Sequence, residues 1–272
     1  MKEVVVFNDI AGVANCTLGV SLPLLNICDC KVYPVPTAVF SSSTRVEGVR
    51  FASLSGFLPK VAEHWAELDF APDAVLVGCF ADEWGAKAAV PIVKLLKNRG
   101  ASVMVDPVMG DDGKIWATPE HVQFMFEMVR LADVTCPNFT EFCALLSADY
   151  EKLYASTFEE KLAFFKGHVG VLGVPKVVVT GVRNGDEVSN FVFDEGKVSV
   201  FSHPFHHKGV CGTGDMFSNI VLARTLWGKP LAEAVAFAGE WISDLMKELP
   251  EKPEYGMYLG GERLLAVRKG IL

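Results

Sequence analysis

The chain has 272 residues, of which 50% are hydrophobic, with a formal net charge of −8 and a pI near 5.3. This acidic balance argues against a nucleic-acid-binding protein, which usually carries a basic excess. No apolar run approaches the roughly 20 residues that a membrane helix needs, and the N-terminus carries no predicted secretion signal. Seven scattered cysteines are typical of free thiols in a reducing compartment. We therefore expect a cytoplasmic protein that binds neither nucleic acid nor membrane.

Short, continuously apolar segments predict strands, and they alternate with longer amphipathic segments that predict helices. The predicted strands are, in chain order, 3–7, 31–35, 74–77, 102–105, 134–136, 176–180, 188–193 and 197–201, while 37–43 fits a short strand or a loop. The predicted helices are 12–27, 57–68, 82–98, 119–131, 138–147, 158–169, 213–227 and 230–248. After Leu249 the tail contains Pro250, Pro253 and several glycines and is predicted to be irregular.

The order of these elements predicts the fold class. Strands that are apolar along their whole length and separated by helices indicate a mostly parallel sheet with helices on both faces, a doubly wound α/β fold. The last two strands predict an antiparallel edge hairpin around residues 194–196. Neither an internal repeat nor a low-complexity linker divides the chain, so residues 1–272 are predicted to form a single domain.

Polar residues follow five of the predicted strands directly. They are Asn8-Asp9, Gly78-Cys79, the run 106–113, the run 137–141 and Thr180-Gly181. One acidic residue after a strand is often only the N-cap of the next helix. Ligands of doubly wound proteins bind outside the carboxyl ends of the strands, so five such ends together predict one binding rim.

The strongest local signal is the glycine-rich turn that enters the predicted helix at 213. Gly212, Thr213 and Gly214 let the backbone approach a ligand, and the first helical turn presents unpaired N–H groups. Asp215 lies in that turn, where its carboxylate can accept a proton from an attacking hydroxyl group while the N–H groups hold a phosphoryl group. The simpler alternative is that Thr213 or Asp215 only caps the helix. Lys208, just upstream, is a candidate for attracting a nucleotide by charge.

Two further strand ends strengthen the phosphoryl-transfer interpretation. Asp106 and Glu141 can supply the one or two carboxylates that Mg²⁺ takes alongside substrate phosphates. The sequence has no Gly-Lys-Ser/Thr ending of a Walker A loop, and it lacks the His-Arg-Asp and Asp-Phe-Gly motifs of protein kinases.

At this point the motifs resemble a known family. The run 106–111, the pair Asn138 and Glu141, and the run 212–215, in this order and spacing, resemble the ribokinase-like superfamily. Within it, residues 8–12 followed by 34–44 are similar to the substrate-side segments of pyridoxal/pyridoxamine kinases. The resemblance covers roughly residues 3–245.

The resemblance implies ATP-dependent phosphorylation of the 5′-hydroxymethyl group of pyridoxal, pyridoxamine or pyridoxine, with Mg²⁺, in a homodimer. Asp215 would be the base, and Gly212, Thr213 and Gly214 would form the anion hole. The resemblance also implies that Asn138 and Glu141 would act on the phosphates and the Mg²⁺ waters, with Asp106 nearby. Thr180 would line the phosphate or monovalent-cation site. Asp9 and Thr44 would hydrogen-bond the substituents of the pyridine ring. A flap over the substrate is expected near 37–55.

Three cysteines depart from the family pattern. Cys136 replaces a threonine of many relatives, and a thiol is a poor ligand for K⁺ or Na⁺. Cys79 occupies the position at which relatives often have an aromatic residue that packs on the substrate ring. Stacking on the ring is therefore expected to be weaker or to come from Phe40 or Phe80. Cys211 precedes the anion hole, where a helix N-terminus lowers a thiol pKa; it is either a reactive thiol or a quiet small residue.

Two other functions remain as alternatives. One is a kinase that acts on hydroxymethylpyrimidine, with the same chemistry and a different ring. The other is a non-catalytic nucleotide- or B6-binding protein, which is disfavoured because a binding module has no need of a base such as Asp215.

Overall fold

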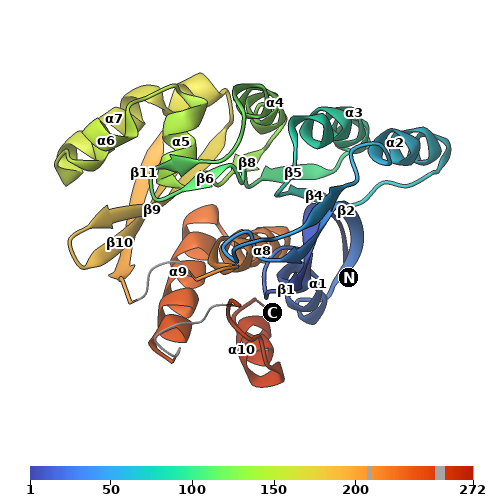
Figure 1. The fold of residues 1–272 in the computed structure, drawn as a ribbon. Helices are drawn as coiled ribbons and strands as arrows, with labels where there is room; N and C mark the ends of the chain where they lie inside the picture. Colours follow the sequence, from blue (N-terminus) through green and yellow to red (C-terminus); the bar gives the residue numbers. More distant parts are fainter. Residues whose placement is uncertain (207–209, 249–254, 272) are drawn as a thin grey trace.

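The computed structural model describes residues 1–206, 210–248 and 255–271. Lys208, proposed above to attract a nucleotide, lies outside these ranges, as does the first part of the tail after Leu249. One nine-stranded sheet runs through the molecule in the order β11-β10-β9-β8-β5-β4-β1-β2-β3 (Figure 1). Its strands are β1 (Lys2–Val13), β2 (Cys30–Ser42), β3 (Phe51–Ser53), β4 (Ala74–Val77), β5 (Ser102–Val105), β8 (Val134–Thr135), β9 (Lys176–Asn184), β10 (Glu187–Asp194) and β11 (Lys197–Pro204).

The sheet has a parallel centre and antiparallel edges. From β2 through β1, β4, β5 and β8 to β9, neighbouring strands pair in parallel. At one edge β3 is antiparallel to β2, and at the other β10 and β11 are added in antiparallel fashion. This confirms the predicted fold class, including the edge hairpin.

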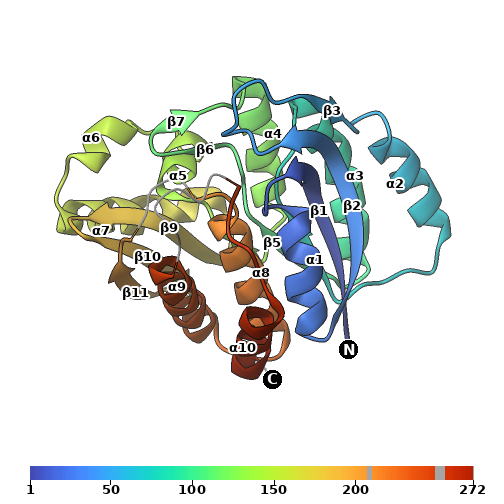
Figure 2. The same cartoon turned by 60° about the horizontal axis from the view of Figure 1, so that its bottom comes forward.

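Helices cover both faces of the sheet, as Figures 1 and 2 show. One face carries α2 (Leu58–Glu67), α3 (Glu83–Asn98), α4 (Pro119–Val129), α5 (Phe139–Leu145), α6 (Tyr150–Tyr154), α7 (Phe158–His168) and the 3₁₀ turn η1 (Val169–Leu172). The other carries α1 (Leu18–Ile27), α8 (Thr213–Leu226), α9 (Leu231–Lys247) and α10 (Gly261–Ile271). No helix in the described ranges is long and apolar enough to cross a membrane.

The continuously apolar start of β1 explains the two layers. Successive side chains of a strand point to opposite faces. Val5 and Phe7 therefore enter the core beneath α2–α7, while Val4 and Val6 enter the core beneath α1 and α8–α10, and all four are fully buried. Each such burial contributes about 1.5–3 kcal/mol to folding.

The structure corrects several predicted boundaries. Residue 12 does not begin a helix, because β1 continues to Val13 and pairs with β2 along its whole length, with a bulge between Asn8 and Ile10. The segment 37–43 belongs to this extended β2. Thr17, at φ 54°, separates β1 from α1.

Six elements of the described ranges were not predicted, among them the edge strand β3 and the 3₁₀ turn η1. Within the tail that was expected to be irregular, α10 forms and buries Val267 and Ile271 against the second core. A small hairpin, β6 (Gly110–Asp111) and β7 (Lys114–Ile115), follows β5, and the single-turn helix α6 follows α5. Helix α10 was missed because Gly260, Gly261 and Gly270 lie at its two ends, and glycines in such positions are typical of irregular segments.

Candidate active site

A pocket of about 410 Å³ lies at the carboxyl ends of the parallel strands. Side chains from all five polar strand ends line it, so the structure brings them together as predicted. The predicted site residues among its lining are Asp9, Thr44, Cys79, Asp106, Asn138, Glu141, Thr180, Gly212, Thr213, Gly214 and Asp215. A concave site of this size can hold a small ligand.

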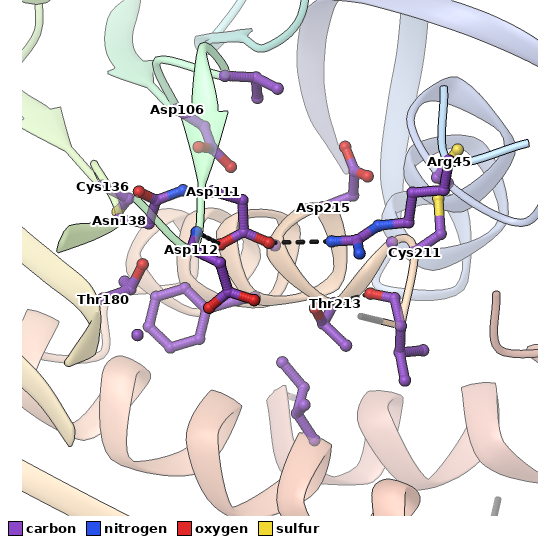
Figure 3. Close-up of a pocket in the computed structure, with 18 of the residues that line it drawn as sticks. Arg45, Asp106, Asp111, Asp112, Cys136, Asn138, Thr180, Cys211, Thr213 and Asp215 are labelled. Atoms are coloured by element: carbon purple, nitrogen blue, oxygen red, sulfur yellow. Dashed lines mark hydrogen bonds and ion pairs between the residues drawn. The ribbon is translucent and has the colours of Figure 1, made fainter. Parts of the chain in front are cut away.

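Asp215 projects from the first turn of α8 into this pocket (Figure 3). Gly212, at φ +90°, precedes the helix and turns the chain so that its first N–H groups face the pocket. The carboxylate is held from β1 and the β1–α1 connection, because Asn8 Nδ2 donates to Oδ1 at 3.0 Å and the Thr17 N–H donates to Oδ2 at 2.9 Å. The base candidate therefore has a fixed orientation.

Asn8 is a positioning residue that the sequence reasoning did not single out. It is 2% exposed, and its Oδ1 accepts hydrogen bonds from the N–H groups of Asp9 (3.1 Å) and Cys79 (2.9 Å). A Cβ on Gly78 would lie 2.8 Å from the Asn8 amide, so only glycine leaves room for it there. Its position beside Asp9 at a strand end was the available signal; nothing in the sequence pointed to Thr17.

Replacing Asn8 by Ala is expected to raise the pKa of Asp215, because the amide donor favours the ionised carboxylate. A base must be deprotonated, so the acidic limb of the kcat–pH profile should move to higher pH, with kcat at neutral pH reduced by about 10-fold or more. Asn184→Ala, on the exposed end of β9, serves as the control. An unshifted profile in a folded Asn8→Ala variant would contradict the positioning role.

Three carboxyl groups face one another across the pocket. Burial, and secondarily the charge of Asp215, raises the pKa of Asp9 to about 7 and that of Asp106 to about 7. Burial also raises the pKa of Asp215, while its bonds from Thr17 and Asn8 oppose the rise. Buried like charges are costly unless a cation or a proton compensates them. The cluster is thus suited to accept protons and to face a cation.

Asn138 and Glu141 form a capping box at the start of α5. Glu141 Oε2 accepts from the Asn138 N–H at 2.8 Å, and Asn138 Oδ1 accepts from the Glu141 N–H at 2.9 Å. Glu141 Oε1 accepts from the Met109 N–H at 3.1 Å, and Asn138 Nδ2 donates to the Gly110 carbonyl at 2.7 Å. Both side chains therefore hold the loop after β5 that carries Asp106.

The residues present fit a Mg²⁺ ion that is also bound by phosphates. Asp106 lines the pocket beside the Ser218 side chain, and burial followed by the charge of Asp106 raises the pKa of Glu141 well above its usual range. No group of three or more His, Cys, Asp or Glu in the part of the chain described here could hold a metal by itself. Mg²⁺ commonly takes one or two carboxylates and completes its shell with phosphates and waters.

The segment 37–55 forms a hairpin of β2 and β3 over one side of the pocket. Its tip is joined to the loop after β5 by an ion pair of 2.9 Å between Arg45 and Asp111 (Figure 3). Both side chains are nearly half exposed, so the pair contributes only about 0–1 kcal/mol. Thr44 lies in the tip and is exposed. The hairpin is thus held weakly at its free end.

The remaining candidates differ in their surroundings. Phe40 lines the pocket and stacks on Phe51 with centroids 5.2 Å apart, whereas Phe80 is 2% exposed within the core, so of these two only Phe40 can contact a substrate ring. Cys136 is 3% exposed, and its burial raises the thiol pKa well above the usual value. Thr180 lines the pocket beside Asn138, where β9 meets the segment after β8.

A doubly wound sheet with a glycine-rich helix N-terminus beside a carboxylate cluster is the arrangement that the resemblance to the ribokinase-like superfamily predicts. The chain belongs to the phosphomethylpyrimidine kinase family, whose model matches residues 28–261. This assignment and the relatives below confirm the resemblance stated from the motifs.

The relatives include kinases for two kinds of ring. The pyridoxal kinase PdxY of Paraburkholderia phymatum is 27% identical over 217 residues, 75% of this chain and 73% of that protein. A hydroxymethylpyrimidine/phosphomethylpyrimidine kinase of Staphylococcus aureus is 27% identical over 164 residues, 58% of this chain and 57% of that protein. Among solved structures, a putative phosphomethylpyrimidine kinase from Bacteroides thetaiotaomicron, crystallised with pyridoxal, superposes with a TM-score of 0.89 at 24% identity over 98% of this chain and 95% of that one.

Proposed function

We propose that this kinase transfers the γ-phosphoryl group of ATP to the 5′-hydroxymethyl group of a B6 vitamer: pyridoxal, pyridoxamine or pyridoxine. The observation that carries the proposal is the placement of Asp215 between the N–H groups at the start of α8 and the buried Asp9 in one pocket. A base with an anion site on one side and a ring-binding carboxylate on the other suits phosphorylation of an alcohol attached to a heterocycle.

In this mechanism Asp215 accepts the proton of the substrate hydroxyl group as its oxygen attacks. The hydrogen bonds from Asn8 and Thr17 fix the orientation of the carboxylate toward that proton. The backbone N–H groups of Gly212, Thr213 and Gly214 bind the oxygens of the transferring phosphoryl group, aided by the helix dipole. Asp106 would hold Mg²⁺, which neutralises charge on the phosphates when it is bound.

Asp9 recognises the ring in this proposal. It is 4% exposed, and burial raises its pKa to about 7. Its ionised form accepts a strong hydrogen bond from a phenolic hydroxyl group or a cationic ring nitrogen, both of which a B6 vitamer offers. Phe40 supplies an apolar wall on the same side of the pocket, and the 37–55 hairpin is proposed to close over the ring and exclude water.

Hydroxymethylpyrimidine is the second candidate substrate. The family model describes phosphomethylpyrimidine kinases, and one relative carries both pyrimidine activities in its name. An exocyclic amino group could also donate to Asp9. The catalytic residues would act in the same way on either alcohol, so the ring alone separates the two proposals.

Release of ADP with each alcohol tests the choice. We expect kcat/KM for at least one B6 vitamer to exceed that for hydroxymethylpyrimidine by about 10-fold or more, since a site built to bind one set of polar groups rejects a ring lacking them. The Asp9→Asn variant should raise KM for the vitamer more than KM for ATP. Turnover of hydroxymethylpyrimidine alone would sink the B6 proposal.

A further inference from the structure

Two cysteines that are far apart in the sequence meet at the wall of the pocket. Cys16 lies in the connection between β1 and α1, and Cys211 lies just before Gly212; both line the pocket, and both are free thiols. The two side chains lie close enough that each shifts the pKa of the other. Their backbones approach as well, because a Cβ on Gly212 would lie 3.3 Å from the Cα of Cys16.

The surroundings of Cys211 stabilise its thiolate. The neighbouring side chains of Cys16 and Ser43 lower its pKa, and the positive charge of Arg45 acts in the same direction (Figure 3 shows Arg45 beside Cys211). Burial and the Asp215 carboxylate oppose these effects, but the pKa of Cys211 is still lowered to about 7. A larger share of this thiol is therefore ionised at neutral pH than the few per cent of an ordinary cysteine.

Cys16 has the opposite properties. The neighbouring Cys211 side chain, together with burial, raises its pKa well above the usual value, so it remains a protonated thiol. All seven cysteines lie within the described ranges, and of these Cys211 is the one with a lowered pKa. Burial raises the pKa of the other five, which are Cys28, Cys30, Cys79, Cys136 and Cys143. The more readily ionised thiol of Cys211 therefore lies beside a second, protonated thiol, that of Cys16.

We propose that Cys211 and Cys16 form a modification site, in which a hydroperoxide oxidises Cys211 and Cys16 converts the product into a disulfide that closes the phosphoryl-transfer pocket. The Cys211 thiolate attacks one peroxide oxygen, the O–O bond breaks, and hydroxide leaves and is protonated to water. Cys16 then attacks the sulfur of the resulting sulfenic acid, an S–S bond forms, and a second water leaves. Two thiols lose two electrons and two protons, and hydrogen peroxide becomes two waters.

A disulfide here would disturb the anion site, an effect that rests on the proposed function. Bonded to Cys16, the Cys211 sulfur is no longer the thiolate that Ser43 and Arg45 of the hairpin tip stabilise. Gly212 follows directly, and its backbone is already packed against Asn15 and Cys16 with no space for even a Cβ. A shift of this turn by about 1 Å moves the N–H groups that bind the phosphoryl group and costs about 10²-fold in rate.

The test treats the full-length protein with hydrogen peroxide and measures both mass and kinase rate. We expect a loss of two hydrogen atoms, a Cys16–Cys211 peptide after non-reducing digestion, a rate lower by about 10²-fold, and recovery of mass and rate with dithiothreitol. The Cys211→Ser variant should form no disulfide when it is treated with peroxide. Cys16→Ser should lack the disulfide and accumulate higher oxides on Cys211 instead.

For each variant, the kinase rate after peroxide treatment is divided by the rate of the same untreated variant. A change that the substitution makes to the basal rate therefore does not affect the comparison. Cys143→Ala, which alters a buried thiol outside the pocket, should still form the disulfide. Absence of the Cys16–Cys211 peptide from the oxidised protein, or a disulfide between Cys16 and another cysteine in oxidised Cys211→Ser protein, would overturn the modification site. If the Cys16–Cys211 disulfide is found by mass but the kinase rate is unchanged, the claim that this bond closes the pocket is overturned. That result would also count against phosphoryl transfer at the turn before α8.

Discussion

Replacing Asp215 by Asn is expected to lower kcat by about 10²–10⁴-fold, the usual contribution of a positioned general base. The amide is nearly the size of the carboxylate, but it cannot take the substrate proton at neutral pH. KM for ATP should change little, because the N–H groups proposed to hold the phosphates belong to the backbone of Gly212–Asp215. Steady-state rates at saturating alcohol and a binding measurement with ATP check both parts.

Asp112→Asn is the matched control for this variant. Asp112 lines the same pocket but is exposed at its rim, and at φ +48° it has a backbone conformation that Asn also adopts readily. Its rate should stay close to that of the unchanged protein. A folded Asp215→Asn protein that retains the full rate would remove Asp215 as the base.

The Asp215→Asn substitution should also change the pKa values of the neighbouring carboxyl groups, Asp9 and Asp106. The charge of Asp215 contributes to the raised pKa values of Asp9 and Asp106, so its removal should lower both. A raised folded-state pKa of an acid means that its ionised form destabilises the fold above the unfolded pKa, near 4. Lowering these values should therefore recover stability as the pH rises above about 5, in full above about pH 7, and offset part of the cost of the lost hydrogen bond to Thr17 or Asn8.

The layout of the sheet could be predicted because its signals are local. Val4–Phe7 is apolar on both faces, which requires a core on each side, and that property is visible in the residues themselves. The extension of β1 to Val13 was not visible, because it depends on pairing with β2 along both strands. For the same reason the hairpin tip at Arg45 and its ion pair with Asp111 could not be read from either segment alone.

In the site, too, the features that depend on neighbouring residues in the sequence could be predicted, whereas those that depend on distant residues could not. Strand-end positions gathered the lining residues correctly because parallel strands share one carboxyl edge. The different roles within this set were not predictable. Of the two carboxylates predicted to bind Mg²⁺, Glu141 is engaged in the capping box with Asn138, whereas Asp106 is not part of it and lines the pocket. Contacts that join Asn8 or Cys16 to the start of α8 span about two hundred residues and have no sequence signature.

Replacing Gly212 by Ala is expected to lower kcat/KM by about 10²–10³-fold, the cost of losing one oxyanion-hole donor. Gly212 has φ +90°, and an added Cβ would lie 2.3 Å from the Asn15 carbonyl oxygen. A backbone atom cannot move aside as a side-chain tip does, so the turn itself must shift and take its N–H groups with it. Strain in the left-handed region should also lower the free energy of unfolding by about 1–3 kcal/mol.

Gly228→Ala separates these two effects, because it lies at the other end of α8 with φ +84° and nothing within 4 Å of the added Cβ. It should lose stability from backbone strain alone and keep its full kinase rate. Thermal melts and kcat/KM for both variants decide the matter. Equal rates in Gly212→Ala and Gly228→Ala would show that the turn before α8 does not hold the transferring phosphoryl group, whereas a loss confined to Gly212→Ala ties catalysis to the backbone that Asn15 and Cys16 keep in place.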